Sequence, residues 1–240
     1  MAQDPWWTAA FTAAYLEVYH HRSDAQAAQE IAGLLPRLAA APGPIVDAGC
    51  GAGRHLAALR AAGLPAIGFD LSADLLRVAR DRSLCRGRLA RADVRRPPFA
   101  GGCGAVLCLF TAFGYFDDAG NAACLAGLGR LVSQGGWVLL DLPEPDALRR
   151  GLQPTSERRT PGGWIVRERR WIAGDRVEKA VEATPPDAAA VTWQESVRLY
   201  REAELHALAS AASLVPDVIW PGLRGPDDQA GRLVCWLRRP

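Results

Sequence analysis

The sequence "IVDAGCGAGRH", residues 45–55, sets the architecture expected for the whole chain. A short apolar run ends in an acid, and Gly49, Gly51 and Gly53 follow within five positions. Glycine adopts positive φ and has no Cβ, so a ligand can contact the main chain there, and the amides that open the next helix offer hydrogen bonds. The pattern predicts a buried strand, a glycine turn that receives a ligand, and a helix that begins at Arg54.

Strands and helices alternate on both sides of this turn. Short loops between them require right-handed crossovers and predict an open, mostly parallel sheet with helices on both faces. After residues 45–48, the expected strands span 66–70, 88–93, 104–110, 136–142, 214–220 and 231–237. The expected fold class is therefore α/β, with a seven-stranded sheet.

Residues 150–199 depart from this alternation. Three segments, 163–171, 176–184 and 190–200, alternate apolar and polar residues and are separated by turn sequences, which is typical of an antiparallel meander. We therefore expect a helical lid over 1–42, an α/β domain over 43–145 and 200–240, and an antiparallel β insertion over 150–199.

Composition and charge narrow the classes of function. The chain has 240 residues, 49% of them apolar, and its 28 basic and 26 acidic residues leave a formal charge of +2, which does not favour nucleic acid as a partner. The beginning of the sequence has no leader pattern and the longest apolar stretch is too short to span a bilayer, so we expect a cytoplasmic protein with no membrane partner. Six cysteines form no C-x-x-C pair, so neither a disulfide frame nor a metal site is expected.

Acids end the next two strands, Asp70 in "GFDLS" and Asp93 in "RADV". A carboxylate at the first position can accept both hydroxyls of a ribose, and one at the second can accept the exocyclic amine of a purine, with Ala92 and Val94 beside the ring. A dinucleotide fingerprint requires a small residue at position 54, where this chain has Arg54. An NAD(P)-dependent oxidoreductase is therefore a weaker alternative.

These motifs resemble those of the class I S-adenosylmethionine-dependent methyltransferases over nearly the whole chain. "VDAGCGAGRH", "GFDLS", "RADV" and "LVSQGGWVLLDL" are similar to motifs of that family. The resemblance implies a Rossmann-like fold, S-adenosyl-L-methionine as cofactor and S-adenosyl-L-homocysteine as product. It implies cofactor contacts at Asp47, Gly49, Gly51, Gly53, Asp70, Leu71, Ala92, Asp93, Val94, Leu109 and Phe110.

A narrower resemblance concerns "LFTAFGYFDD", residues 109–118, and the β insertion. Both look like features of small-molecule methyltransferases of bacterial secondary metabolism, including the amino-sugar N-dimethyltransferases. This implies a small-molecule substrate and an insertion that helps to build the substrate pocket and a homodimer. Methylation of N, O or C stays open, and an enzyme that binds the cofactor without transferring its methyl group, such as a cyclase, would carry the same cofactor motifs.

Methyl transfer from a sulfonium is an in-line displacement, so positioning supplies most of the catalysis. A hydroxyl or carbon acid needs a base, for which we expect His20, because its ordinary pKa is close to working pH, with His21 as the alternative. Tyr19 and Tyr115 complete the expected catalytic set, and Arg54 is a candidate partner of the cofactor carboxylate. The expected substrate-binding residues are Tyr15, Thr111, Phe113, Arg198 and Tyr200, where an ion pair within the β sheet is the alternative role of the arginine.

Overall fold

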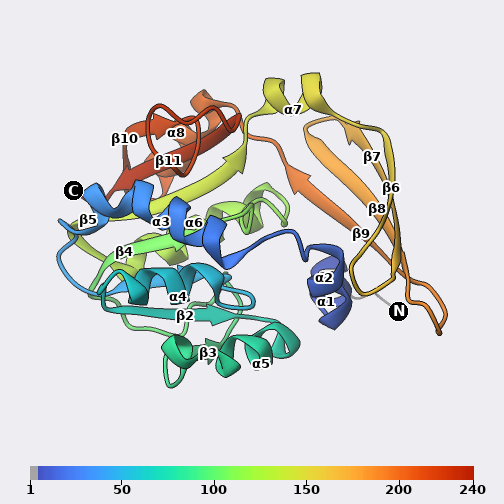
Figure 1. Ribbon diagram of the computed structural model, residues 1–240. Coiled ribbons are helices and arrows are strands. Elements are labelled where there is room, and N and C mark those ends of the chain that lie inside the picture. Colours follow the sequence, from blue (N-terminus) through green and yellow to red (C-terminus); the bar gives the residue numbers. More distant parts are fainter. Residues whose placement is uncertain (1–4) are drawn as a thin grey trace.

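The computed structural model describes residues 5–240 and contains a seven-stranded sheet and a separate four-stranded sheet (Figure 1). Residues 1–4 of the expected lid and of the expected leaderless start lie outside the described residues. The strand order of the larger sheet is β10-β11-β5-β4-β1-β2-β3, and β11 runs opposite to the other six strands. Its strands are β1 Ile45–Ala48, β2 Ala66–Asp70, β3 Leu89–Arg91, β4 Cys103–Cys108, β5 Val132–Pro143, β10 Val215–Trp220 and β11 Arg232–Arg238. The α/β class and the seven-stranded sheet expected from the sequence are confirmed.

Helices cover both faces of this sheet, which is why β1 and β4 are buried at every residue and, apart from Asp47, contain no polar side chain larger than a thiol. The helices α3 and α4 pack on one face, and α6 and α8 pack on the other. The helical elements around the sheet are α3 Asp24–Leu38, α4 Arg54–Ala61, α5 Ala73–Asp81, the short 3₁₀ helix η1 Ser83–Cys85, α6 Asp118–Leu131 and α8 Glu202–Ala211. Among residues 5–240, no helix is both long and apolar enough to cross a membrane.

The smaller sheet is antiparallel throughout, in the order β6-β7-β8-β9, and confirms the expected β insertion. Its first strand was not predicted, because "TSERR" is polar and forms an edge strand that alternates between exposed and half-buried positions. A short helix, α7, connects β5 to this sheet (Figure 1). The bounds are α7 Pro145–Gly151, β6 Thr155–Arg159, β7 Ile165–Ala173, β8 Arg176–Thr184 and β9 Val191–Arg198.

The N-terminal segment lies between the two sheets (Figure 1). Within the expected helical lid, the chain forms α1 Trp6–Ala10 and α2 Ala13–Val18, which are separate helices because Thr12 is extended, with φ −106° and ψ −174°. Apolar residues of both helices join a core with the inner face of the smaller sheet, formed by Ala10, Val18, Val166, Val181, Ala183 and Trp193. The segment is thus packed on the insertion and faces the α/β unit.

Candidate active site

The glycine turn after β1 brings bare main chain to the edge of the sheet. Gly49 and Gly51 have φ of +72° and +52°, which side chains with a Cβ rarely adopt. A Cβ at Gly49 would lie 3.0 Å from that of Ala112, in the loop after β4. Gly53 begins α4, where a Cβ would lie 3.1 Å from that of Ala79 in α5. The first two glycines therefore open the site, and the third allows two helices to approach.

Asp70 ends β2 directly beside this turn. Its Oδ2 accepts a hydrogen bond from the Gly51 amide at 2.8 Å, and its Oδ1 accepts one from the Ser72 amide at 2.8 Å. Burial raises the pKa of the Asp70 carboxyl, and the backbone donors offset this only in part. An ionised carboxylate has about four acceptor positions, so two remain for donors of a ligand.

Asp93 follows β3 and is held by a neighbour that the sequence analysis did not single out. A guanidinium nitrogen of Arg95 lies 2.6 Å from Asp93 Oδ2, and the Arg95 amide donates to Oδ1 at 2.8 Å. Burial raises the pKa of Asp93, but the hydrogen bonds and charge of Arg95 outweigh it, so that this pKa is lowered. The same guanidinium lies 4.5 Å from the ring centre of Phe116. Asp93 is therefore a fixed, ionised acceptor.

Three cavities meet above the glycine turn. The Asp70 cavity, of about 390 Å³, lies over the ends of β1, β2 and β3. The Asp47 cavity, of about 270 Å³, lies between the glycine turn and the end of α2. The Lys179 cavity, of about 390 Å³, lies between the N-terminal segment that contains α1 and α2 and the smaller sheet. Tyr15 and Phe110 line all three, so a group placed at these two rings can extend into each cavity.

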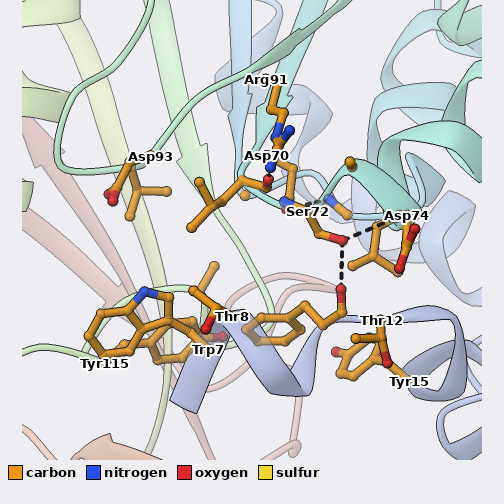
Figure 2. A pocket seen from close by; sticks show the side chains of 18 of the residues that line it. Trp7, Thr8, Thr12, Tyr15, Asp70, Ser72, Asp74, Arg91, Asp93 and Tyr115 are labelled. Atoms are coloured by element: carbon orange, nitrogen blue, oxygen red, sulfur yellow. Dashed lines mark hydrogen bonds between the residues drawn. The ribbon is translucent and has the colours of Figure 1, made fainter. Parts of the chain in front are cut away.

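Figure 2 shows the Asp70 cavity with Asp70 and Asp93 on one side and the helices α1 and α2 on the other. The Ser72 hydroxyl donates to the Phe11 carbonyl at 2.6 Å and so ties the break between α1 and α2 to the start of α5. The Phe11 ring stacks on that of Tyr115 with centroids 5.8 Å apart. The side chains labelled in the view are Trp7, Thr8, Thr12, Tyr15, Asp70, Ser72, Asp74, Arg91, Asp93 and Tyr115.

The Asp47 cavity combines one buried carboxylate with two cations. Asp47 is 2% exposed, and its Oδ2 has no hydrogen-bond partner within residues 5–240. Burial raises the pKa of this carboxyl to about 6. The guanidiniums of Arg22 and Arg54 each lie 5.0 Å from the ring centre of Phe110, and neither pairs with a carboxylate of the described chain. The cavity therefore offers charges of both signs to a ligand.

The wall of the Lys179 cavity is a network of charged side chains on the smaller sheet. Lys179 in β8 stands between Arg170 in β7 and Glu195 in β9 in the strand register. Its Nζ lies 2.8 Å from Glu195 and 3.8 Å from Glu168. The Tyr19 hydroxyl accepts a hydrogen bond from Lys179 and donates to Glu195 at 2.8 Å. Tyr19, which follows α2, and the strands of the smaller sheet thus build this wall together.

The loop after β4 is strained where it enters the junction. Phe110 and Thr111 have φ of +53° and +61°, in the left-handed region. The Asp141 side chain accepts the Phe110 amide at 2.8 Å, and its carbonyl accepts the Thr111 amide at 3.0 Å. Such conformations cost about 1–3 kcal/mol each and cluster at functional sites. The strain turns the Phe110 ring toward the cavities.

Most of the residues expected to contact the cofactor line two of the cavities. Gly53 and Ala92 line none of the three, because Gly53 packs between helices and Ala92 packs against the core. The sequence analysis also missed the α1 side of the Asp70 cavity, which only the packing of the lid brings there: Trp7, Thr8, Phe11 and Thr12. The expected residues that line the Asp70 cavity are Gly49, Gly51, Asp70, Leu71, Asp93, Val94, Leu109 and Phe110, and Asp47 lines the Asp47 cavity.

The expected catalytic residues are divided among the cavities. Tyr19 and Tyr115 line the Lys179 cavity. His20 instead lines the Asp47 cavity, where it is exposed and its Nδ1 lies 3.0 Å from the Glu17 carbonyl oxygen. His21 lines the Lys179 cavity, and burial lowers its pKa. The structure therefore places the preferred histidine away from the Lys179 cavity.

Two of the five expected substrate residues, Tyr15 and Thr111, line the Lys179 cavity, and the other three line none of the three cavities. Phe113 is 1% exposed and packs in the core against the Tyr200 ring, with centroids 5.8 Å apart. Arg198 forms ion pairs with carboxylates of the turn before β8 and of α8, which is the alternative role considered for it. The structure thus places these three side chains in the core or in ion pairs, outside the three cavities.

Residues 45–136, which include the glycine turn and both acids, match the model of a family described as "Methyltransferase domain". Over these residues the chain is similar to a methyltransferase domain. Over these residues the match supports the expected methyltransferase and does not favour the oxidoreductase alternative. No curated protein sequence matches the chain.

Solved methyltransferases share the fold of this chain over nearly its whole length. The CcbJ methyltransferase from Streptomyces caelestis is 17% identical, with 97% of this chain and 98% of that chain covered and a TM-score of 0.79. CalS10, an amino pentose methyltransferase from Micromonospora echinaspora, is 23% identical over 94% and 96% of the two chains, with a TM-score of 0.70. The sugar N-methyltransferase KedS8 from a Streptoalloteichus species is 22% identical over 94% and 93%, with a TM-score of 0.72. At these identities the likeness concerns the fold.

Proposed function

We propose that the methyltransferase binds S-adenosylmethionine across the Asp70 and Asp47 cavities and methylates an amine of a small, polar acceptor in the Lys179 cavity. The junction of the three cavities at Tyr15 and Phe110 carries this proposal. S-adenosylmethionine has an adenosine arm and an amino-acid arm that meet at a sulfonium carrying the methyl group. The adenosine arm, the amino-acid arm and the methyl group diverge from the sulfonium, and the three cavities diverge from Tyr15 and Phe110.

The Asp70 cavity fits the adenosine arm. The free acceptor positions of Asp70, which two main-chain amides hold in place, suit the neighbouring hydroxyls of a ribose. Asp93, fixed by Arg95, suits the exocyclic amine of adenine. Val94 and Leu109 border the same cavity and supply apolar surface for the ring.

The Asp47 cavity fits the amino-acid arm. The buried Asp47 Oδ2 lacks a partner among the described residues, and an α-ammonium group would satisfy it. Arg22 and Arg54, which have no carboxylate partner in the described chain, would bind the α-carboxylate. The expected role of Arg54 is thereby kept, and Arg22 joins it.

The residues at the junction would position the reaction. S-adenosylmethionine supplies an electrophilic methyl group, and the rings of Tyr15, Phe110 and Tyr115 can hold the sulfonium by cation–π attraction without reacting with it. The Ser72 bond to the Phe11 carbonyl holds the lid over the site and limits the access of water. The chain then contributes mainly alignment of the acceptor with the methyl carbon.

The acceptor class and the biological setting are part of the same proposal. The polar, charged wall of the Lys179 cavity suits an acceptor rich in hydrogen-bonding groups, and the structural neighbours CalS10 and KedS8 are amino pentose and sugar N-methyltransferases. We propose residues 1–42 as the lid, 43–145 with 200–240 as the cofactor domain, and 150–199 as the wall of the acceptor site and a homodimer contact. We also propose a cytoplasmic enzyme of secondary metabolism, as the family resemblance implies.

Two measurements test this function. Calorimetry should show S-adenosylmethionine and S-adenosylhomocysteine binding well below millimolar Kd, and absence of binding at that level removes the cofactor assignment. A mass-spectrometric screen of amino sugars and of matched sugars that carry hydroxyl in place of the amine should show the gain of a methyl group only in the former. Methylation of the hydroxyl series alone would replace the amine by oxygen as the acceptor.

A further inference from the structure

Lys179 is the only lysine of the chain, since the other 27 of the 28 Lys and Arg residues are arginine. Arginine stays protonated in proteins, whereas the lysine amine loses its proton readily when it is buried. A chain that uses arginine at every other Lys or Arg position therefore places its single lysine side-chain amine at one site. That site is the Lys179 cavity.

The Lys179 side chain is 13% exposed and lines the cavity that adjoins the proposed position of the sulfonium. Its Nζ lies 2.8 Å from Glu195 and donates a hydrogen bond to the Tyr19 hydroxyl. It also lies 4.6 Å from the ring centre of Tyr19, which packs it against the lid. The charged and titratable groups that face it are Glu195 of β9, Glu168 and Arg170 of β7, and Tyr19, His21 and Arg22 of the lid.

This environment lowers the pKa of Lys179 below its ordinary value. Burial is the largest cause, and the attraction of Glu195 and Glu168 offsets it only in part. Tyr19, by contrast, has its pKa raised well above its ordinary value by burial, so its hydroxyl keeps its proton and orients the amine. The cavity thus contains one amine that can become neutral and a phenol that stays neutral.

We propose that Lys179 is a catalytic residue whose neutral amine takes the proton released by the acceptor amine when it is methylated. In this step the S–CH₃ bond breaks and its electron pair stays on sulfur, which becomes a neutral thioether. The lone pair of the acceptor nitrogen forms the new N–CH₃ bond, and an N–H bond then breaks with its electron pair returning to nitrogen. The proton passes to the lone pair of Nζ, and Glu195 and Tyr19 act as positioning residues. This assignment rests on the proposed methyl transfer.

The single lysine permits a direct test on the full-length protein without an acceptor. Protein made with ¹³C-labelled lysine gives one lysine side-chain signal, which is followed by NMR against pH in the presence of saturating S-adenosylhomocysteine. We expect a midpoint below the ordinary value of about 10.4. Glu195→Gln should lower it further, because a carboxylate 2.8 Å from Nζ is removed. A midpoint at or above the ordinary value overturns the assignment.

Kinetics separate a proton acceptor from a structural cation. With an amino sugar that the mass-spectrometric screen shows to be methylated, kcat should rise with pH along the NMR midpoint, and Lys179→Met should lower it about 10²- to 10⁴-fold and abolish this limb. Lys179→Arg should not rescue, since arginine keeps the charge but cannot take a proton. Rescue by arginine, or a wild-type kcat and pH profile in Lys179→Met, overturns the proposal.

A control variant and a binding measurement distinguish a wrong assignment of Lys179 from a wrong proposed function. Arg169→Met removes a cation from an exposed position of β7 that lies in register with Ala180, the residue next to Lys179, and should keep kcat and its pH profile. Both variants should bind S-adenosylhomocysteine as the wild type does. If the wild type does not bind it, the proposed function fails; if it binds and the lysine titrates ordinarily, only the assignment of Lys179 fails.

Discussion

Arg232 Nε in β11 lies 2.7 Å from Asp141 Oδ1 in β5, and this pair supports the strained loop after β4. The other oxygen of Asp141 accepts the amide of Phe110, and Arg232 also donates to the Thr111 hydroxyl at 3.0 Å. Two strands distant in sequence thereby hold the ring at which the three cavities meet. The ion pair between Arg232 and Asp141 therefore helps to hold the loop that places Phe110 where the three cavities meet.

Arg232→Met should destabilise the protein substantially. The Asp141 side chain is 1% exposed and would keep its charge without its cation, while Arg232 is 26% exposed, so we expect a loss of about 2–4 kcal/mol in the free energy of unfolding, near the lower end for buried pairs. Urea denaturation measures it. Arg77→Met, at a side chain 68% exposed in an ion pair with Asp74, is the control and should change stability by less than about 0.5 kcal/mol. Equal effects of both variants would show that the pair does not support the loop.

Asp70→Ala should weaken cofactor binding. Loss of hydrogen bonds to a charged group costs about 1.5–3 kcal/mol, which corresponds to a roughly 10- to 150-fold higher Kd for S-adenosylhomocysteine by calorimetry. Asp81→Ala removes an exposed carboxylate at the end of α5 and should leave the Kd unchanged. An Asp70→Ala protein that binds as tightly as the Asp81→Ala control would remove Asp70 from the site.

The pKa of Asp47 predicts a pH-dependent stability in the absence of ligand. Burial raises this pKa to about 6, above the ordinary value of about 3.9 in an unfolded chain. The folded protein therefore binds the proton more tightly, and the resulting stabilisation is complete below about pH 4 and is lost as the pH rises through about 6. The free energy of unfolding of the wild type relative to Asp47→Asn should fall by about 2–3 kcal/mol over this interval. A difference that is constant with pH contradicts the burial of this charge.

Cofactor binding should show the opposite trend. An ionised Asp47 attracts the α-ammonium group, so the affinity for S-adenosylmethionine should increase as the pH rises through about 6, where the pKa of the carboxyl lies. In Asp47→Asn this dependence should disappear. Calorimetry with 5′-methylthioadenosine, which lacks the amino-acid arm, is the control and should show no such increase. The same increase with both ligands would exclude Asp47 as the partner of the ammonium group.

Ser72→Ala should loosen the lid. The Ser72 hydroxyl both caps α5, by accepting the Leu75 amide, and donates to the Phe11 carbonyl. Ser23→Ala is the matched control, because the Ser23 hydroxyl caps α3 through the Gln26 amide and, among residues 5–240, forms no hydrogen bond to α1 or α2. Each variant should lose about 1 kcal/mol of stability through its cap. Only Ser72→Ala should speed S-adenosylhomocysteine dissociation, about 2- to 10-fold in stopped-flow measurements, as expected for one lost hydrogen bond; equal rates in both variants would show that this bond does not hold the lid.

Local patterns predicted the elements whose burial is regular. The strands β1 and β4 are apolar at nearly every position because helices cover both their faces, and β8 and β9 alternate because only one of their faces packs on the lid. The edge strand β6 carries no such signal, since backbone pairing with β7 rather than side-chain burial holds it. The break at Thr12 was equally invisible, because it depends on a contact with Ser72, sixty-one positions from Phe11.

The residues of the candidate site also fall into a group that the sequence predicted and a group that only the structure showed. The glycine turn, Asp70 and Asp93 could be found from the sequence because each lies directly after a strand, and parallel strands bring their carboxyl ends to one edge. The wall of the Lys179 cavity could not, because its members come from α2, β7, β8 and β9 and meet only when the lid packs on the insertion. The sequence shows that Lys179 is the only lysine, but only the structure shows that its side chain is largely buried beside a cavity.

The sequence by itself determined the α/β sheet, the bare turn and the two acids, since these follow from periodicity and from backbone conformations that act over a few residues. Only the tertiary structure decided where Phe113, Arg198 and Tyr200 point, which histidine faces which cavity, and that an amine stands opposite the lid. Side-chain surroundings of this kind arise from contacts between segments far apart in the chain. No local pattern encodes the distance between them.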